Sequence, residues 1–321
     1  MIKGRGSASN PHNRFEKTHR SQEEETDLNL PVTQFLQDHS RTIIAYNNSP
    51  DVGFEASVNP YRGCEHGCIY CYARPTHEYL GYSAGLDFET KIMVKEDAPQ
   101  LLRKELQSPG WKPQALAMSG VTDPYQPIEG KLQLTRKCLE VLLEFRNPVV
   151  MITKNRRIIR DIDLLSALAR FQSAAVFLSI TTLNDDVCGV LEPRTSPPEK
   201  RLEAVSALAK AGIPTGVLIA PVIPGLTDHE IPKILQSAVA AGAAFAGMVP
   251  LRLPYGVADL FKEWLEKHFP DQKGKVLNRI RSLRGGKLND PRFGTRMEGE
   301  GIFSDQIRRL FDLACRKYGI A

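Results

Sequence analysis

Residues 59–72 of the chain read Asn-Pro-Tyr-Arg-Gly-Cys-Glu-His-Gly-Cys-Ile-Tyr-Cys-Tyr, and this stretch decides how the whole sequence is interpreted. It holds three of the six cysteines within eight residues, namely Cys64, Cys68 and Cys71. Thiolates this close together can bind one metal centre. Three thiolates are one fewer than the four that an ordinary [4Fe–4S] cluster takes, so such a cluster would keep one iron open for another ligand.

Other uses of these cysteines fit the sequence less well. A disulfide framework needs an even number of cysteines, whereas the cluster has three and the others, Cys138, Cys188 and Cys315, are scattered. Structural zinc sites come as CxxC pairs with a second pair further along the chain, and no second pair exists here, although His66 lies inside the loop as an additional donor. The pattern therefore favours an iron–sulfur cluster, with zinc or free thiols as the alternatives.

Composition indicates an ordinary globular protein. The 321 residues are 42 % hydrophobic and 25 % charged, and this length fits one large α/β barrel or two medium domains. No stretch approaches the ~20 apolar residues of a membrane span, and the N-terminal sequence lacks an apolar signal segment. We expect a cytoplasmic protein with no membrane contact, because free thiols and oxygen-sensitive clusters suit a reducing compartment. The sequence does not indicate an oligomeric state.

Positive charge is concentrated near the C-terminus. The chain carries a net charge of +5, and residues 273–321 hold twelve Lys and Arg against five Asp and Glu. A basic region of this kind can contact the phosphates of a nucleic acid. The alternative is a solvated helical face, or cations that pair with acidic groups and hold the C-terminal region in place. Arg281, Arg284 and Lys287, around the Gly285-Gly286 pair, are the candidate contacts.

Short apolar runs alternate with helical patterns from about residue 56. Strands are expected near 57–61, 115–119, 149–153, 176–181, 215–220 and 245–250. Helices are expected near 97–107, 132–145, 158–170, 198–211, 229–241 and 257–268. Because parallel strands need crossover connections, which helices supply, six such units predict a partial (β/α)6 barrel of the TIM type and not a closed eight-stranded one.

Three segments follow from this pattern. We expect a poorly ordered segment over residues 1–40, the partial barrel over 41–256 and a helical, basic extension over 257–321. The run from Ser196 to Glu199 predicts a capping box for the fourth helix, and Gly212 predicts its end.

The spacing CxxxCxxC, with Tyr70 directly before the last cysteine, resembles the signature of the radical S-adenosylmethionine (SAM) superfamily. The resemblance covers roughly residues 56–255. Within the superfamily, the segments Cys-Ile-Tyr-Cys-Tyr, Thr-Asp-Pro-Tyr-Gln-Pro and Leu-Glu-Pro-Arg-Thr look like the spore photoproduct lyase and DNA repair photolyase-like branch. The lyase of that branch has a hydrogen-donating cysteine near the end of its second strand. This chain departs from that pattern, because it reads Ser119-Gly120-Val121-Thr122 there.

The resemblance implies a cofactor and a reaction. Cys64, Cys68 and Cys71 would bind three irons of a [4Fe–4S] cluster, and the fourth iron would chelate the amine and carboxylate of SAM. An electron from a donor such as flavodoxin or ferredoxin would then cleave SAM to methionine and a 5′-deoxyadenosyl radical, which abstracts hydrogen from a substrate. The net reaction would be lyase- or transferase-like, and nucleic acid is the candidate substrate.

The resemblance also implies SAM contacts at the carboxyl ends of the strands, where barrels carry their chemistry. The candidates are Tyr70, Ser119, Gly120, Thr122, Asp123, Ser179, Thr181, Arg194 and Val222. A glycine lets the backbone approach a ligand, an aspartate accepts hydrogen bonds from an ammonium group, and an arginine can clamp a carboxylate. An Asp-Pro turn is the alternative for Asp123, and a surface salt bridge is the alternative for Arg194.

Two further residues are candidates for catalysis. Cys188 follows the fourth strand on the loop side and could donate a hydrogen atom to a product radical, although free cysteines are more often simply buried. Tyr72 completes, with Tyr70, the paired tyrosines of the branch. Cys138 shares a helical face with apolar residues and is expected in the core, as is Cys315. A protein of another class remains the alternative: a nucleic-acid-binding protein whose iron–sulfur or zinc loop is structural, with no catalysis.

Overall fold

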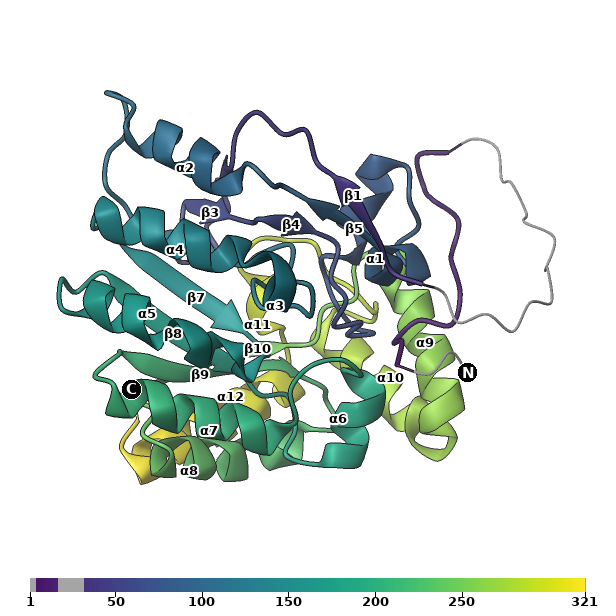
Figure 1. The fold of residues 1–321 in the computed structure, drawn as a ribbon. Coiled ribbons are helices and arrows are strands. Elements are labelled where there is room, and N and C mark those ends of the chain that lie inside the picture. The colour runs from purple at the N-terminus through teal and green to yellow at the C-terminus, as the bar shows by residue number, and fades with distance from the viewer. Residues whose placement is uncertain (1–3, 17–31, 321) are drawn as a thin grey trace.

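The computed structural model describes residues 4–16 and 32–320, and its main layer is a seven-stranded sheet (Figure 1). The strand order is β10-β9-β8-β7-β6-β3-β2, and the six strands from β10 to β3 are parallel. These six are β3 (Ala56–Val58), β6 (Leu116–Met118), β7 (Val149–Thr153), β8 (Ala174–Ser179), β9 (Thr215–Val222) and β10 (Phe245–Pro250). The antiparallel strand β2 (Ile44–Tyr46) forms one edge, so the sheet of the described residues is open, as six strand–helix units predict.

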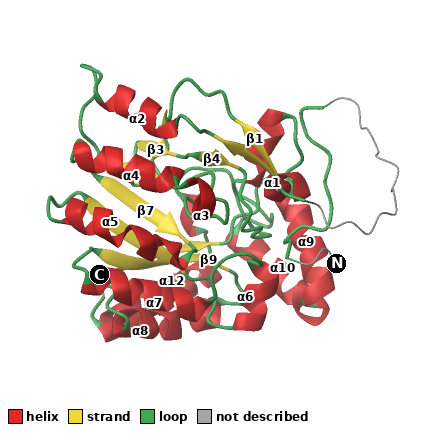
Figure 2. Cartoon of the chain, viewed as in Figure 1, coloured by secondary structure: helices red, strands yellow, loops and turns green. Residues whose placement is uncertain are grey.

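Helices follow the parallel strands and cover the sheet (Figure 2). They are α2 (Ala98–Leu106), α4 (Leu134–Glu144), α5 (Ile162–Ala169), α7 (Pro198–Lys210), α8 (Ile231–Ala240) and α9 (Val257–His268). Each predicted helix is thereby confirmed within a few residues. Apolar side chains at helical spacing explain why these segments fold as they do: Cys138, Val141 and Leu142 of α4 are all buried in the core against the sheet. The prediction that Cys138 is a core residue is confirmed.

Short elements complete the connections between the main helices and strands. They are the 3-10 helices η1 (Arg74–Leu80), η2 (Arg156–Asp161) and η3 (Asp228–Glu230) and the short helices α1 (Leu86–Thr90), α3 (Glu129–Leu132) and α6 (Asp185–Leu191). No helix among the described residues is long and apolar enough to cross a membrane.

The predicted capping box at the start of α7 is wrong. Pro197 is the N-cap residue, and no side chain caps the helix. The Ser196 hydroxyl instead accepts the N–H of Arg156 at 2.9 Å and donates to Asn155 at 3.3 Å. The Ser196 hydroxyl therefore bonds to the loop at residues 155–156 and not to the first turn of α7. The end of the helix is as predicted, since Gly212 has φ +73° and its N–H bonds to the carbonyl of Ala209.

The N-terminal part is more structured than the sequence indicates. Within the segment expected to be poorly ordered, Gln34–Gln37 forms β1, which joins β5 (Lys91–Val94) and β4 (Tyr61–Arg62) in a second, three-stranded sheet. Residues 4–16 lie beside α9 in Figure 1, and the buried carboxylate of Glu89 accepts the backbone N–H groups of Gly6 at 3.0 Å and Ser7 at 2.8 Å. Hydrogen bonds to a carboxylate far away in sequence hold this segment in place. Its ordered conformation could therefore not be predicted from its own apolar pattern. Residues 17–31 lie outside the described residues.

The C-terminal extension is helical, and several of its arginines are buried or form ion pairs. It continues with α10 (Pro270–Leu283), α11 (Thr295–Glu298) and α12 (Ile302–Tyr318), and α12 packs on α8. Arg284, expected as a phosphate contact, is buried and donates to the carbonyls of Leu251, Thr295 and Arg296. Other arginines form ion pairs: Arg279 with Asp228, Arg292 with Asp290, and Arg296 with Asp51. The structural alternative therefore describes Arg284, whereas Lys287 is exposed and Arg281 is half-buried, so phosphate contact by these two stays a prediction. The division of the chain at residue 256 stays a prediction.

A glycine substitution tests how tightly β9 and β10 pack. A Cβ atom on Gly216 of β9 would lie 2.0 Å from the ring of Phe245 in β10 and 2.4 Å from its carbonyl oxygen. We expect Gly216→Ala to lower the free energy of unfolding by about 1–3 kcal/mol, because overpacking forces the backbone to shift. Urea denaturation measures this change.

Gly189→Ala is the matched control for this substitution. Gly189 is exposed in α6, and nothing lies within 4 Å of the Cβ that it would gain. Alanine favours a helix over glycine by up to about 1 kcal/mol, so this variant should be as stable as the parent or more so. Equal stabilities of the two variants would contradict the packing described for β9 and β10.

Candidate active site at the carboxyl edge of the sheet

The cysteine loop follows β3 and β4, and its backbone is fixed by one buried arginine. The Arg74 side chain has no exposed surface, and its guanidinium donates to the carbonyls of Cys68 at 3.0 Å and Gly67 at 3.3 Å. The same group donates to the carbonyl of Gly85 and forms an ion pair of 2.5 Å with the equally buried Glu89. The loop therefore has a defined shape before any metal binds.

Two glycines allow the turns of this loop. Gly63 has φ +77° and Gly67 has φ +68°, a region that side-chain-bearing residues rarely adopt. A Cβ atom on Gly67 would also lie 2.7 Å from the Glu89 carboxylate. Both glycines are thus needed for the backbone conformation, Gly67 also for the close approach of Glu89 and Gly63 for that of the Phe88 carbonyl at 2.9 Å.

The three thiols fit a metal cluster by their chemistry and their shared loop. All three are free, Cys64 and Cys68 are buried, and Cys71 is half-buried. Burial raises the pKa of Cys68 well above its usual value, and Glu192 and the thiols of Cys71 and Cys64 raise it further. Burial likewise raises the pKa of Cys71 to about 11. A bound cation would offset these effects, because metals bind thiolates and release their protons.

Residues 4–16 and 32–320 contain no group of three or more His, Cys, Asp or Glu side chains already placed to hold a single metal ion.

Glu192 is the centre of a buried polar group beneath the loop. Its carboxylate accepts hydrogen bonds from the Tyr70 hydroxyl, the Thr181 hydroxyl at 2.7 Å and the Arg201 guanidinium, and it lies 3.1 Å from Nζ of Lys154. Burial alone would raise the pKa of Glu192. Arg201 and Lys154 outweigh that effect and hold the pKa well below its ordinary value. The carboxylate is therefore charged and fully partnered.

This group joins the ends of three strands to the cysteine loop. Lys154 follows β7 and donates to the carbonyl of Ala220 in β9 at 2.9 Å, and the hydroxyl of Thr181, which follows β8, lies 3.1 Å from the same carbonyl. Tyr70 belongs to the loop itself. The predicted SAM contacts Tyr70 and Thr181 are thus brought together, 3.3 Å apart through their hydroxyl groups.

Asp123 makes a second connection between strand ends and the loop. One carboxylate oxygen accepts the Tyr125 N–H at 2.8 Å and the Thr153 hydroxyl at 2.7 Å. The other accepts the Lys154 N–H at 2.8 Å and lies 3.4 Å from His66 of the cysteine loop. Burial disfavours a charged His66, but Asp123 and Cys64 outweigh burial and raise the pKa of His66 to about 10. The bond to Tyr125 is the expected turn, and the contact of Asp123 with SAM stays a prediction.

The remaining predicted contacts lie at the same edge of the sheet. Ser119 and Gly120 are half-buried directly after β6, and the Gly120 carbonyl accepts the Tyr72 hydroxyl at 2.7 Å. The Thr122 hydroxyl donates to the carbonyl of Gly63 at 2.7 Å, so it supports the cysteine loop. Ser179 is the last residue of β8, Val222 is the last residue of β9, and both are buried.

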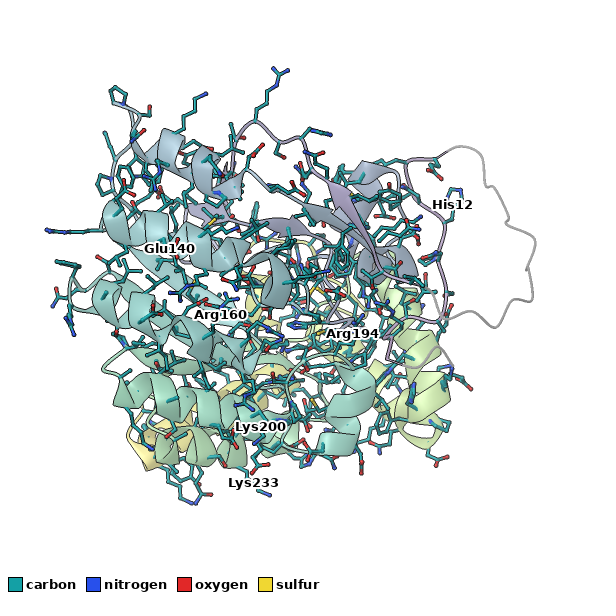
Figure 3. All side chains as sticks on the ribbon, in the orientation of Figure 1. His12, Glu140, Arg160, Arg194, Lys200 and Lys233 are labelled. Atoms are coloured by element: carbon teal, nitrogen blue, oxygen red, sulfur yellow. The ribbon has the colours of Figure 1, made fainter. Side chains whose placement is uncertain are left out.

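Arg194 points toward the cysteine loop and forms an ion pair there. Figure 3 shows it beyond the tip of β7, and its guanidinium lies 3.5 Å from the Glu65 carboxylate. Its backbone N–H also bonds to the carbonyl of His66. The salt-bridge alternative therefore describes its present contacts, and a clamp on a SAM carboxylate stays a prediction.

The two catalytic candidates lie in different surroundings. Cys188 is buried, with its sulfur 3.5 Å from Arg201 and 3.9 Å from Glu192, so it belongs to the polar group beneath the loop. Tyr72, directly after Cys71, is 52 % exposed. We call the surface at Tyr72 and the nearby Arg252 the mouth of the site. Geometry therefore gives Tyr72 access to a substrate, whereas Cys188 is enclosed.

Sequence reasoning missed two cations at the ends of strands. Lys154 directly follows β7, and Arg252 follows β10 by two residues. Arg252 is half-buried, and its buried Nε has no hydrogen-bond partner in residues 4–16 and 32–320. Its Nη1 lies 3.0 Å from the sulfur of Met297, and its guanidinium lies 5.8 Å from the centroid of the Tyr72 ring. Both residues follow predicted strands, and this position could have identified them, because catalytic and binding residues of barrels lie at the carboxyl ends of the strands.

Comparisons with known proteins agree with this geometry. A family model described as the radical SAM superfamily matches residues 58–238. An uncharacterized protein of Mycobacterium tuberculosis is 34 % identical over 238 residues, which are 74 % of this chain and 69 % of the relative. An uncharacterized protein of Methanocaldococcus jannaschii is 29 % identical over 71 % of this chain and 81 % of its own length.

A solved structure has a similar fold. It is a spore photoproduct lyase complexed with dinucleoside spore photoproduct, with a TM-score of 0.62 and 17 % identity over 88 % of this chain and 79 % of the lyase. The family model spans more than half of the chain and includes the cysteine loop, Asp123 and Glu192. The chain therefore belongs to the radical SAM superfamily and is a radical SAM enzyme.

Proposed function

We propose that Cys64, Cys68 and Cys71 bind three irons of a [4Fe–4S] cluster and that SAM binds at the fourth. Reductive cleavage of SAM would supply a 5′-deoxyadenosyl radical, and a flavodoxin or ferredoxin would supply the electron. The observation that carries this proposal is the position of three free thiols on one loop that Arg74 fixes at the carboxyl edge of the parallel strands. The protein's own task is to orient the reactants and exclude water.

Residues around the loop have distinct parts in this proposal. Tyr70 would flank the adenine of SAM, because its hydroxyl is held by Glu192 and its ring cannot turn away without breaking that bond. Gly120 leaves the backbone after β6 open to a ligand, since the Cβ it lacks would have only the Asn59 side chain nearby, at 3.9 Å. The hydroxyls of Ser119 and Ser179 are further donors at that edge and belong to neither of the two buried polar groups.

We propose nucleic acid as the substrate class. Arg252 supports this, because a half-buried guanidinium with an unpartnered Nε favours an anionic ligand such as a phosphate. The exposed ring of Tyr72 lies next to it, where a base could stack. The similar fold of a lyase complexed with a dinucleoside photoproduct also supports this substrate class.

Single cysteine substitutions test the cluster. Wild-type protein reconstituted anaerobically should hold about four iron and four sulfide per chain. We expect Cys64→Ala, Cys68→Ala and Cys71→Ala each to lose the cluster and the formation of 5′-deoxyadenosine under reducing conditions. Iron and sulfide analysis and chromatography of the products measure both.

Cys138→Ala is the control, because Cys138 is a core thiol in α4 far from the loop in sequence and should leave iron content unchanged. Retention of iron by Cys68→Ala together with its loss from Cys138→Ala would show that the ligands are wrongly assigned. One zinc per chain, with no 5′-deoxyadenosine, would point to a structural metal loop.

Arg252→Met tests the anionic substrate. Loss of a charge-assisted hydrogen bond costs about 1.5–3 kcal/mol, so affinity for an oligonucleotide should fall about tenfold or more. SAM cleavage without nucleic acid should persist, because Arg252 contacts neither the loop backbone nor Glu192. Arg281→Met makes the same charge change on α10 and should have little effect on binding. Equal losses for the two variants would indicate general charge attraction and not a site at the mouth.

A further inference from the structure

Three exposed aromatic side chains from distant parts of the chain surround one guanidinium. Phe15, Tyr79 and Tyr255 are 54 %, 72 % and 65 % exposed, and we call them the aromatic platform. The Arg14 guanidinium lies 4.6, 5.5 and 3.8 Å from the three ring centroids, and the rings of Phe15 and Tyr79 are 4.8 Å apart. Such distances are those of cation–π contacts.

The platform residues lie on two segments that also carry active-site residues. Tyr79 lies in η1, which begins three residues after Cys71. Tyr255 lies three residues after Arg252, in the segment that runs from β10 to α9, and Arg252 in turn lies over the ring of Tyr72. Because three residues of extended chain span at most about 10 Å, Tyr255 and Arg252 are close enough for one extended strand to contact both.

Burial does not explain why these rings are here. Large aromatic side chains normally stabilise a protein by leaving water, and these keep more than half of their surface in it. Tyr255 also has φ +51°, a left-handed conformation that is unusual for a bulky residue and costs free energy. A surface that keeps exposed rings at such a cost fits a ligand with flat apolar faces.

Charge narrows the choice of ligand. The acidic group that contacts Arg14 is Glu78, at 2.9 Å, and its side chain is buried, so it presents little negative charge at the surface. On the adjacent α9, Asp259 is paired with Lys262 at 2.8 Å. Exposed rings beside arginines are the usual surface for unpaired bases, because every base offers a π-face and the cations attract the backbone.

We propose that the aromatic platform stacks unpaired bases of a single-stranded nucleic acid and leads the strand to Tyr72 and Arg252. This inference rests on the proposed function in treating nucleic acid as the substrate. Single strands fit better than duplexes, since the bases of a duplex already stack on one another. The platform adds a binding surface outside the cofactor site and none of its residues takes part in SAM cleavage.

The double variant Tyr79→Ala/Tyr255→Ala tests this proposal. Its affinity for a fluorescent single-stranded oligonucleotide, measured by anisotropy on the reconstituted full chain, should fall about tenfold or more, since each stacked base contributes ~1–3 kcal/mol. The slope of affinity against salt should stay the same, because no charge is removed. Iron content, 5′-deoxyadenosine formation without nucleic acid and the melting temperature should also stay unchanged.

Phe171→Ala is the matched control. Phe171 is 46 % exposed and lies 4.4 Å from the guanidinium of Arg146, but it precedes β8 and so lies at the amino edge of the sheet, opposite the site. This variant should bind the oligonucleotide as wild type does. The proposal is overturned if wild type and double variant bind with equal affinity, or if Phe171→Ala loses as much affinity as the double variant. It is also overturned if the double variant only melts at a lower temperature and binds unchanged.

The two proposals fail in distinguishable ways. Wild-type protein that forms 5′-deoxyadenosine but binds no single-stranded oligonucleotide at low salt overturns the platform and leaves the cluster chemistry intact. Protein that binds single strands through Tyr79 and Tyr255 but forms no 5′-deoxyadenosine overturns the proposed reaction and leaves the platform intact.

Discussion

The buried ion pair between Arg74 and Glu89 fixes the loop on which the rest of the site depends. Both side chains are fully enclosed, so each would be costly to bury alone. Their remaining hydrogen-bonding capacity is used on the backbone: Arg74 binds carbonyls of the cysteine loop, and Glu89 binds the N–H groups of Gly6 and Ser7. Breaking such a pair leaves an uncompensated charge that costs about 3–5 kcal/mol. The loop and the N-terminal segment are therefore held by the same charges.

Two further carboxylates extend this arrangement to the sheet. Glu192 and Asp123 are both buried, and each accepts hydrogen bonds from the ends of strands and contacts a side chain of the cysteine loop, Tyr70 or His66. In a low-dielectric interior a fully satisfied polar network is rigid, whereas a partly satisfied one is costly. The loop thus meets the parallel strands through two charged groups that tolerate little displacement, which is what a site that must orient two reactants requires.

Periodicity explains why so much of the fold could be predicted from the sequence. The six parallel strands and their helices depend on apolar spacing within one segment, and the cysteine ligands depend on spacing within eight residues. The failures all depend on partners far away in sequence. Ser196 bonds to Asn155 and does not cap its helix, and residues 4–16 are held by Glu89. Lys154 is positioned by its contacts with Glu192 and Ala220. A local pattern carries no record of such contacts.

Net charge alone does not show which arginines keep donors for an anion, and the geometry of the arginines shows why. An ion pair such as Arg292 with Asp290 occupies the in-plane N–H donors of the guanidinium. Most arginines of residues 279–296 likewise donate to a carboxylate or a backbone carbonyl. Stacking over an aromatic ring uses the face of the guanidinium and leaves its donors in the plane available. Arg252 over Tyr72 is of this kind, with an unpartnered Nε. The arginines at 279, 284, 292 and 296 therefore have donors occupied by partners, whereas the buried Nε of Arg252 has no partner among the described residues.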